Sequence, residues 1–238
     1  MISSILFSLI LIFSILLFIR NCSKLYRNIN LGKDINRSDN SNFRFKKMIR
    51  LAFGQSKMFD KPIVGILHFI VYVAFVLINI ELLEIVIDGV LGTHRVLAPY
   101  LGSFYNFLIA FFELLALAVI ISVVFWIRRN FLKIKRFLSN DLKGWPKNDA
   151  NYILYIEVVL MFLFLNMNAT DQFLQNANYS YYGDYGSFPI SSFLLPLYDN
   201  FDVASVVIIE RASWWLHILG ILFFLNYLYY SKHLHILL

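Results

Sequence analysis

The sequence predicts an all-α protein, a single bundle of five transmembrane helices over residues 1–238. Hydrophobic residues make up 59% of the 238 residues and charged residues only 15%, well below the roughly 25% of a soluble domain. The apolar residues gather in stretches long enough, or nearly so, to cross a hydrocarbon core, which takes about 20 helical residues. This composition excludes a cytosolic enzyme, a disordered tail and a nucleic-acid-binding domain.

Five apolar stretches define the predicted elements, and the membrane requires each of them to be a helix. Lipid offers no hydrogen-bond partners, so backbone groups must be satisfied within each segment. The fourth stretch is the shortest and ends on the polar residues Asn166 and Asn168. An aromatic segment, 169–211, follows it, and we expect this segment to fold over the outer face, with an interfacial helix around 201–211. The predicted helices are about 2–19, 62–87, 103–127, 152–168 and 212–231.

The first stretch is typical of an uncleaved membrane anchor rather than of a signal peptide. It lacks a basic segment at its start, and no small-residue cleavage site follows it. Its basic residues Arg20, Lys24 and Arg27 lie on the C-terminal side instead. This distribution places the N-terminus outside.

The remaining basic residues predict the same orientation for the whole chain. Of the 21 Lys and Arg residues, eleven lie in 20–61 and seven in 128–147. Lys232 follows the last helix, and only Arg95 and Arg211 belong to the opposite side. By the positive-inside rule the C-terminus is cytoplasmic. The two basic segments are also a surface on which a soluble redox partner could dock, although topology alone accounts for their charge.

The histidines indicate a haem protein. His217 and His235 are 18 residues apart, which corresponds to five turns of an α-helix, so one helix would present both on the same face. The rise over this distance is about 27 Å, which would place them near opposite membrane surfaces. Imidazole is a standard axial ligand of haem iron, and ionisable groups inside a membrane segment are candidates for function. His233 is rotated by about 160° from His217 and is the weaker candidate.

The partner ligands would come from the second helix and the connection after it. His68 lies on the inner side with His235, and the pair would hold an inner haem. His94 would pair with His217 at an outer haem if the chain breaks near Gly89 or Gly92 and folds back. Each histidine has an alternative role as an interfacial or hydrogen-bonding residue. Gly65 and Gly220 lie one turn from His68 and His217, where they leave room for a macrocycle or permit close helix packing.

Acidic residues mark a second candidate site near the outer face. Glu81, Glu84 and Asp88 follow helical spacing on one face, and a buried carboxylate is costly in lipid. They indicate a quinol site or a proton path; the alternative is polar contact between helices or at the water boundary. We expect the same choice for two further carboxylates, Glu113 and Glu157.

The single cysteine, Cys22, excludes an internal disulfide and an iron–sulfur cluster within this chain, since a cluster takes about four thiolates. Any [4Fe–4S] cluster must therefore lie in a partner or in a domain beyond this chain.

The histidine-bearing helices resemble the di-haem cytochrome b of the respiratory nitrate reductase gamma subunit. That family has five helices and two ligands about 18 residues apart on the last one, matched here by His217 and His235. It carries two ligands on its second helix, where this chain has only His68. The resemblance implies one or two b-type haems and a link to quinone in a respiratory chain.

Longer runs resemble the N-terminal membrane part of iron–sulfur-binding oxidoreductases of Bacteroidetes-type bacteria, relatives of heterodisulfide reductase. The runs are INLGKDINRSDN (29–40), GQSKM (54–58), LINIELLEIVIDGVLGTHR (77–95), GWPKNDANYILY (144–155) and WWLHILGILFFLNYLYYSKHLHILL (214–238). The resemblance implies the bacterial inner membrane, a cytoplasmic iron–sulfur or flavin partner, and a substrate-converting site outside this chain. The competing hypothesis is a haem-free structural anchor for a redox partner.

Overall fold

The computed structural model describes residues 2–33, 39–54, 58–60, 62–127, 132, 144–231 and 234. All regular secondary structure within these residues is helical. Five helices are long and apolar enough to cross a membrane, which confirms the predicted fold class. They are α1 (Ile2–Ile29), α3 (Pro62–Leu91), α5 (Ser103–Ile127), α6 (Trp145–Asn176) and α7 (Val203–Tyr227).

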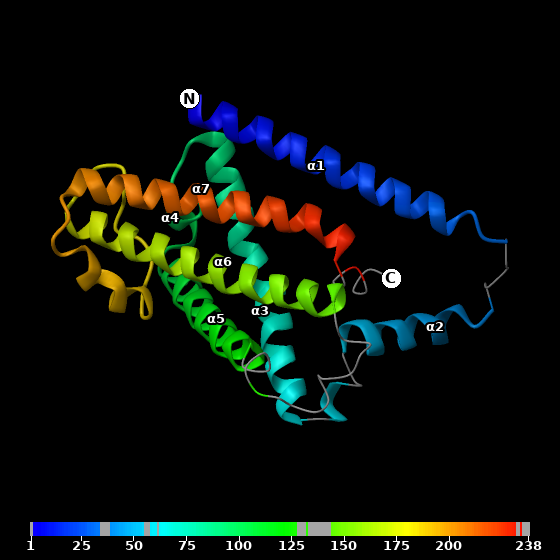
Figure 1. The fold of residues 1–238 in the computed structure, drawn as a ribbon. Coiled ribbons are helices and arrows are strands. Elements are labelled where there is room, and N and C mark those ends of the chain that lie inside the picture. Colours follow the sequence, from blue (N-terminus) through cyan, green and yellow to red (C-terminus); the bar gives the residue numbers. More distant parts are fainter. Residues whose placement is uncertain are drawn as a thin grey trace.

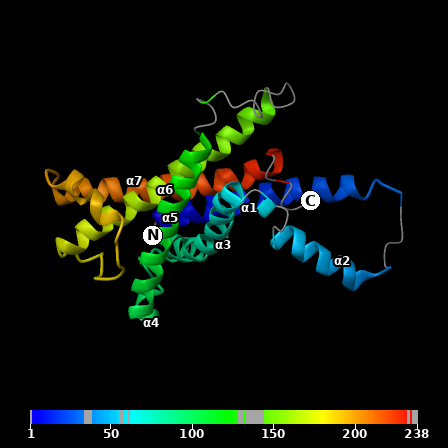
Figure 2. The same cartoon turned by 90° about the horizontal axis from the view of Figure 1, so that it is seen from below.

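Short helical elements lie in the connections. The first connection contains α2 (Ser41–Met48), which stands apart from the five long helices in both views (Figures 1 and 2). The remaining short elements are η1 (Ile49–Phe53), η2 (Met58–Asp60), α4 (Ala98–Leu101), η6 (Ser191–Tyr198) and η7 (Leu228–Tyr230).

The antiparallel pair of α6 and α7 forms the centre of the bundle, and α3 and α5 cross it (Figure 1). The main apolar core lies where these helices meet and includes Ile109, Phe112, Phe164 and Ile218, each at most 3% exposed. Burial of such side chains is the main packing contribution between the helices. Polar contacts supplement it, as where Tyr227 donates a hydrogen bond to Asp149 across the α6–α7 pair.

Helix α1 packs along α7 and against the end of α3, and most of its apolar side chains face outward. Phe7 is its buried contact: the ring lies 5.4 Å from that of Trp214 and fills the space beside Gly89, where a Cβ would come within 2.5 Å of it. Exposed apolar side chains on a helix of this length are suited to lipid contact.

Four helices are longer than the sequence predicted, and α3 gains the fewest residues, since it ends at Leu91 rather than at 87. Helix α1 continues to Ile29, α6 covers Trp145–Asn176 rather than 152–168, and α7 begins at Val203 rather than 212. In α6, a polar residue that shortened the prediction is satisfied inside the protein, as Asn168 is fully buried and hydrogen-bonded. The expected interfacial helix around 201–211 is mostly the start of α7 itself, where Val206 packs on α6 and on the segment between the two helices.

Two of the described connections meet at one end of the bundle. The α3–α5 connection touches the α6–α7 connection, because the Tyr181 hydroxyl donates to the Thr93 carbonyl oxygen. The Gly186 amide of the α6–α7 connection also donates to the Asn106 side chain at the start of α5. This shared end is where the sequence placed both outer segments. Which end faces the cytoplasm stays a prediction from the charge distribution.

Candidate functional site

His217 is buried in the middle of α7, with 2% of its surface exposed. Its Nδ1 lies 3.0 Å from the carbonyl oxygen of Leu160 on α6. A carbonyl oxygen can only accept, so Nδ1 carries the proton and a neutral ring has an unprotonated Nε2. A backbone carbonyl that fixes one ring nitrogen in this way orients the other nitrogen for a metal.

The ring lines a cavity of about 100 Å³ between α3, α5, α6 and α7. The wall is almost entirely apolar, and Asn79 and Glu157 supply the polar groups besides His217. The apolar lining residues are Val71, Phe75, Ile78, Leu82, Val119, Leu160, Met161, Ile221 and Phe224. The site therefore presents one imidazole to a largely apolar space inside the bundle.

The chemistry of His217 fits an axial haem ligand, but the space around it does not hold a porphyrin as it stands. Pockets that bind cofactors or drug-sized ligands measure roughly 300–1,000 Å³, several times the volume found here. A haem bound at His217 would have to displace the lining side chains.

The geometric link between His217 and His235 requires one uninterrupted helix, and the structure does not provide it. The α-helix ends at Tyr227, a 3₁₀ turn follows over Leu228–Tyr230, and Ser231 has an extended backbone. The count of five turns therefore does not relate the two rings. His233 and His235 lie outside the described residues, so their role as ligands stays a prediction.

The extension of α7 also changes the expected depth of His217. With the helix starting at Val203, this residue lies near the middle of the span rather than near its outer end. His68 lies on α3 with an exposed side chain. His68 precedes the cavity residues Val71 and Phe75 by three and seven residues, so all three lie on one face of α3.

Gly65 and Gly220, the glycines beside the candidate ligands, both pack against other parts of the chain. Gly65 is buried. A Cβ at Gly220 would lie 2.7 Å from the Leu160 Cδ2 atom, so this glycine accommodates Leu160 and allows α6 and α7 to approach closely. The sequence suggested that Gly220 makes room for a macrocycle or permits close helix packing, and in the structure it permits close packing.

A second, polar cluster surrounds Arg95 at the end of the bundle where α3 and α6 end. Its Nε donates to the Asp171 carboxylate at 2.6 Å, one terminal nitrogen to the Tyr105 hydroxyl at 3.1 Å and the other to the Asn168 side chain at 3.0 Å. The guanidinium also lies 5.2 Å from the centre of the Phe188 ring. Burial would lower the pKa of Arg95, but the neighbouring Asp171 carboxylate and Tyr105 hold it well above its usual value.

The predicted proton-site carboxylates Glu84, Asp88 and Glu113 accept hydrogen bonds that hold the loops in place. Glu84 accepts from the Leu97 amide and the Tyr105 hydroxyl, and Asp88 accepts from the amides of Arg95 and Val96 and the Thr93 hydroxyl. Glu113 accepts from Asn168, from the Ser191 hydroxyl and from the amides of Ile190 and Ser191. These hydrogen bonds match the alternative to a proton path, which was polar contact between helices or at the water boundary.

His94 belongs to this cluster and not to the cavity at His217. Its Nε2 lies 3.4 Å from the Asp171 carboxylate, and its ring packs 4.7 Å from that of Tyr182. The Tyr182 hydroxyl donates to Glu210, and burial beside this carboxylate raises the pKa of Tyr182. The two histidines line different cavities in the described part of the chain.

The sequence interpretation missed Arg95, Asp171 and Glu210 as members of a site. Arg95 and Arg211 are the two basic residues that lie neither in the basic segments nor near the C-terminus. Charges near a membrane span usually have partners, so their isolation could have indicated a buried ion pair. Asp171 carried no such signal, since it lies 76 residues from Arg95 in the sequence.

Comparison with known proteins finds a similarity to an oxidoreductase. No family model matches the sequence, and no solved structure matches it. The chain is similar to the probable iron–sulfur-binding oxidoreductase FadF of Bacillus subtilis (strain 168), with 25% identity over 239 residues. The match covers 99% of this chain and 31% of the relative, so the chain spans about a third of that protein's length.

Proposed function

We propose that the chain is the membrane electron-transfer part of an iron–sulfur oxidoreductase, passing electrons between the quinone pool and a redox domain at the cytoplasmic face. The similarity to FadF and the five helices support this proposal. The observation that carries it is the buried His217 ring, oriented by the Leu160 carbonyl and lining an apolar cavity.

The cofactor we propose is one or two b-type haems with His217 as an axial ligand. His68 is the described candidate for a further ligand, since it lies on the α3 face that lines the cavity. His235 and His94 stay candidates from the sequence resemblance, and His94 is the weaker because it already contacts Asp171. The haem, when bound, would carry single electrons; the chain holds the ring and excludes water from it.

The substrate-converting chemistry belongs, in this proposal, to a part not present in this chain. The relative is about three times as long as the matched region and is described as iron–sulfur-binding. With one cysteine, this chain needs a partner or a further domain for any such cluster. The basic segments 20–61 and 128–147 would face that redox partner in the bacterial inner membrane.

The test is the reduced-minus-oxidised absorption spectrum of the purified protein. We expect a b-type α-band that His217→Ala and His217→Gln both remove. The glutamine can still donate a hydrogen bond to the Leu160 carbonyl, so His217→Gln separates loss of the ligand from loss of packing. Leu216→Ala is the matched control, because that neighbouring side chain is 57% exposed and lies outside the cavity.

A specific observation favours the alternative, a haem-free anchor for a redox partner. The cavity is small and Leu160 fills the space at Gly220, which is the packing expected of an interior without a cofactor. A colourless wild-type protein that still binds its partner through the basic segments would support the anchor. A band that persists in both His217 variants would reject His217 as a ligand.

A further inference from the structure

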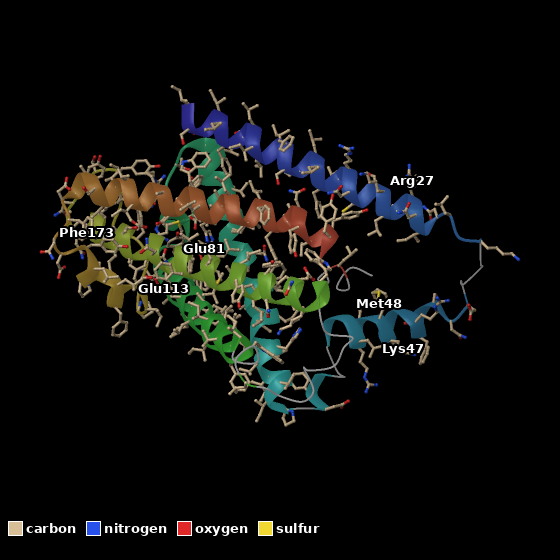
Figure 3. All side chains as sticks on the ribbon, in the orientation of Figure 1. Arg27, Lys47, Met48, Glu81, Glu113 and Phe173 are labelled. Atoms are coloured by element: carbon tan, nitrogen blue, oxygen red, sulfur yellow. The ribbon has the colours of Figure 1, made fainter. Side chains whose placement is uncertain are left out.

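Glu81 differs from the carboxylates around it in having an oxygen without a partner. Its side chain is 5% exposed, and Oε2 is buried with no hydrogen-bond partner among the described residues. Glu84, three residues along the same helix face, has both oxygens satisfied. Figure 3 shows Glu81 and Glu113 inside the bundle, on α3 and α5. A buried carboxylate oxygen that lacks a donor is costly when it is charged, because it has lost its water without gaining a partner.

A cavity of about 30 Å³ adjoins Glu81. This volume is enough for one water molecule, which needs roughly 10–15 Å³ of such space and two to four polar partners. Asp88 and His94 also line the cavity, and both are partly exposed. The cavity therefore lies between a buried carboxyl group and groups that reach the surface.

Burial, more than the neighbouring charges, favours the neutral form of the Glu81 carboxyl group, because an ionised carboxylate is costly away from water. The one cation lining the cavity is Arg95, and its donors already serve Asp171, Tyr105 and Asn168. The other ionisable groups around Glu81 are carboxylates, one histidine and one tyrosine. They are Glu84 and Asp88 on α3, His94 in the following loop, Tyr105 and Glu113 on α5, Asp171 on α6 and Glu210 on α7.

We propose that Glu81 is a proton-binding site, holding a neutral carboxyl group at neutral pH that exchanges its proton with solvent through one water molecule in the adjoining cavity. The step is a simple transfer: the carboxyl group gives its proton to that water and forms a carboxylate and a hydronium ion, and the reverse step restores it. Glu84, Asp88 and Glu113 have a structural role instead. The inference does not depend on haem or quinone binding.

Infrared difference spectroscopy of the full chain in lipid nanodiscs tests this inference. A pH titration should show the C=O stretch of a protonated carboxyl group at neutral pH, which disappears in alkaline buffer and shifts in D₂O. Glu81→Gln should remove this band. The proposal is overturned if the band is absent from the wild-type protein, if it persists in Glu81→Gln, or if it does not shift in D₂O.

Glu84→Gln is the matched control, an identical substitution one helical turn away. It should keep the band and lower the melting temperature, because it weakens the hydrogen bonds that Leu97 and Tyr105 make with the carboxylate. Glu81→Gln should leave the melting temperature unchanged, because glutamine mimics a neutral carboxyl group. A large fall in the melting temperature for Glu81→Gln would show instead that the wild-type group is an ionised, structural carboxylate.

Discussion

At the scale of single residues, Arg95 joins the loop after α3 to α5 and α6. Its side chain is buried with Asp171, and its backbone amide donates to Asp88. Taking two charges out of water costs several kcal/mol per ion, which their mutual attraction offsets only when the remaining donors and acceptors are also satisfied. Here Tyr105 and Asn168 satisfy the other guanidinium nitrogens, so the pair depends on a complete network.

Asp171→Asn should therefore be strongly destabilising. It leaves the Arg95 charge buried without its counter-ion, which typically costs about 3–5 kcal/mol. The measurement is the free energy of unfolding in detergent. Asp184→Asn, the same substitution at an exposed position in the α6–α7 connection, should stay within about 0.5 kcal/mol of the wild type. Equal stability of the two variants would contradict the network described for Arg95.

At the scale of helices, close contact between α1 and α3 depends on Gly89. An added Cβ would meet three atoms of the Phe7 ring at 2.5–2.9 Å, and the ring is held by Trp214 and Trp215 on α7. An alanine gains roughly 0.5–1 kcal/mol of helix stability over glycine. Overpacking of a rigid core costs about 1–3 kcal/mol, so the steric cost exceeds the gain.

Gly89→Ala should accordingly lower the free energy of unfolding by about 0.5–2 kcal/mol, the difference between these two effects. Adding Phe7→Leu to Gly89→Ala should recover part of the loss, because the smaller side chain makes room for the methyl group. Gly32→Ala is the control, since its Cβ would meet only the Ile29 carbonyl oxygen at an ordinary 3.5 Å. A neutral or stabilising Gly89→Ala would mean that α1 is not packed on α3 as described.

At the scale of the whole molecule, the described basic residues of α1 and α2 lie apart from an end whose α6–α7 connection carries three aspartates and no basic residue. Arg27 on α1 and Lys47 on α2 lie away from Phe173, which marks the end of α6 in Figure 3. The same end of α6 holds Asp171, the ion-pair partner of Arg95. In a cell membrane, this separation predicts that the basic end is cytoplasmic.

Cysteine labelling measures this orientation. In a Cys22→Ser background, Asp184→Cys and Asp39→Cys place single thiols at exposed positions of the two ends. A membrane-impermeant maleimide should label Asp184→Cys in intact cells and Asp39→Cys only after permeabilisation. The reverse pattern would place the N-terminus in the cytoplasm.

The candidate site was predictable only in part. Burial of His217 follows from an imidazole within an apolar run, and the structure agrees. Its relation to His235 did not follow, because the helix ends at Tyr227 and local composition after it gave no stop signal such as glycine or proline. The carboxylates on α3 were recognised as a group, yet their individual roles depend on donors from other segments.

The sequence by itself determined the fold class and the number of long helices, because lipid-compatible composition and helix length are local properties of each segment. Only the tertiary structure decided which polar groups meet. Glu81 and Glu84 share a helix face, but the Leu97 amide and the Tyr105 hydroxyl reach only Glu84. Those donors come from a loop and a neighbouring helix, and their positions result from packing contacts that no local pattern contains.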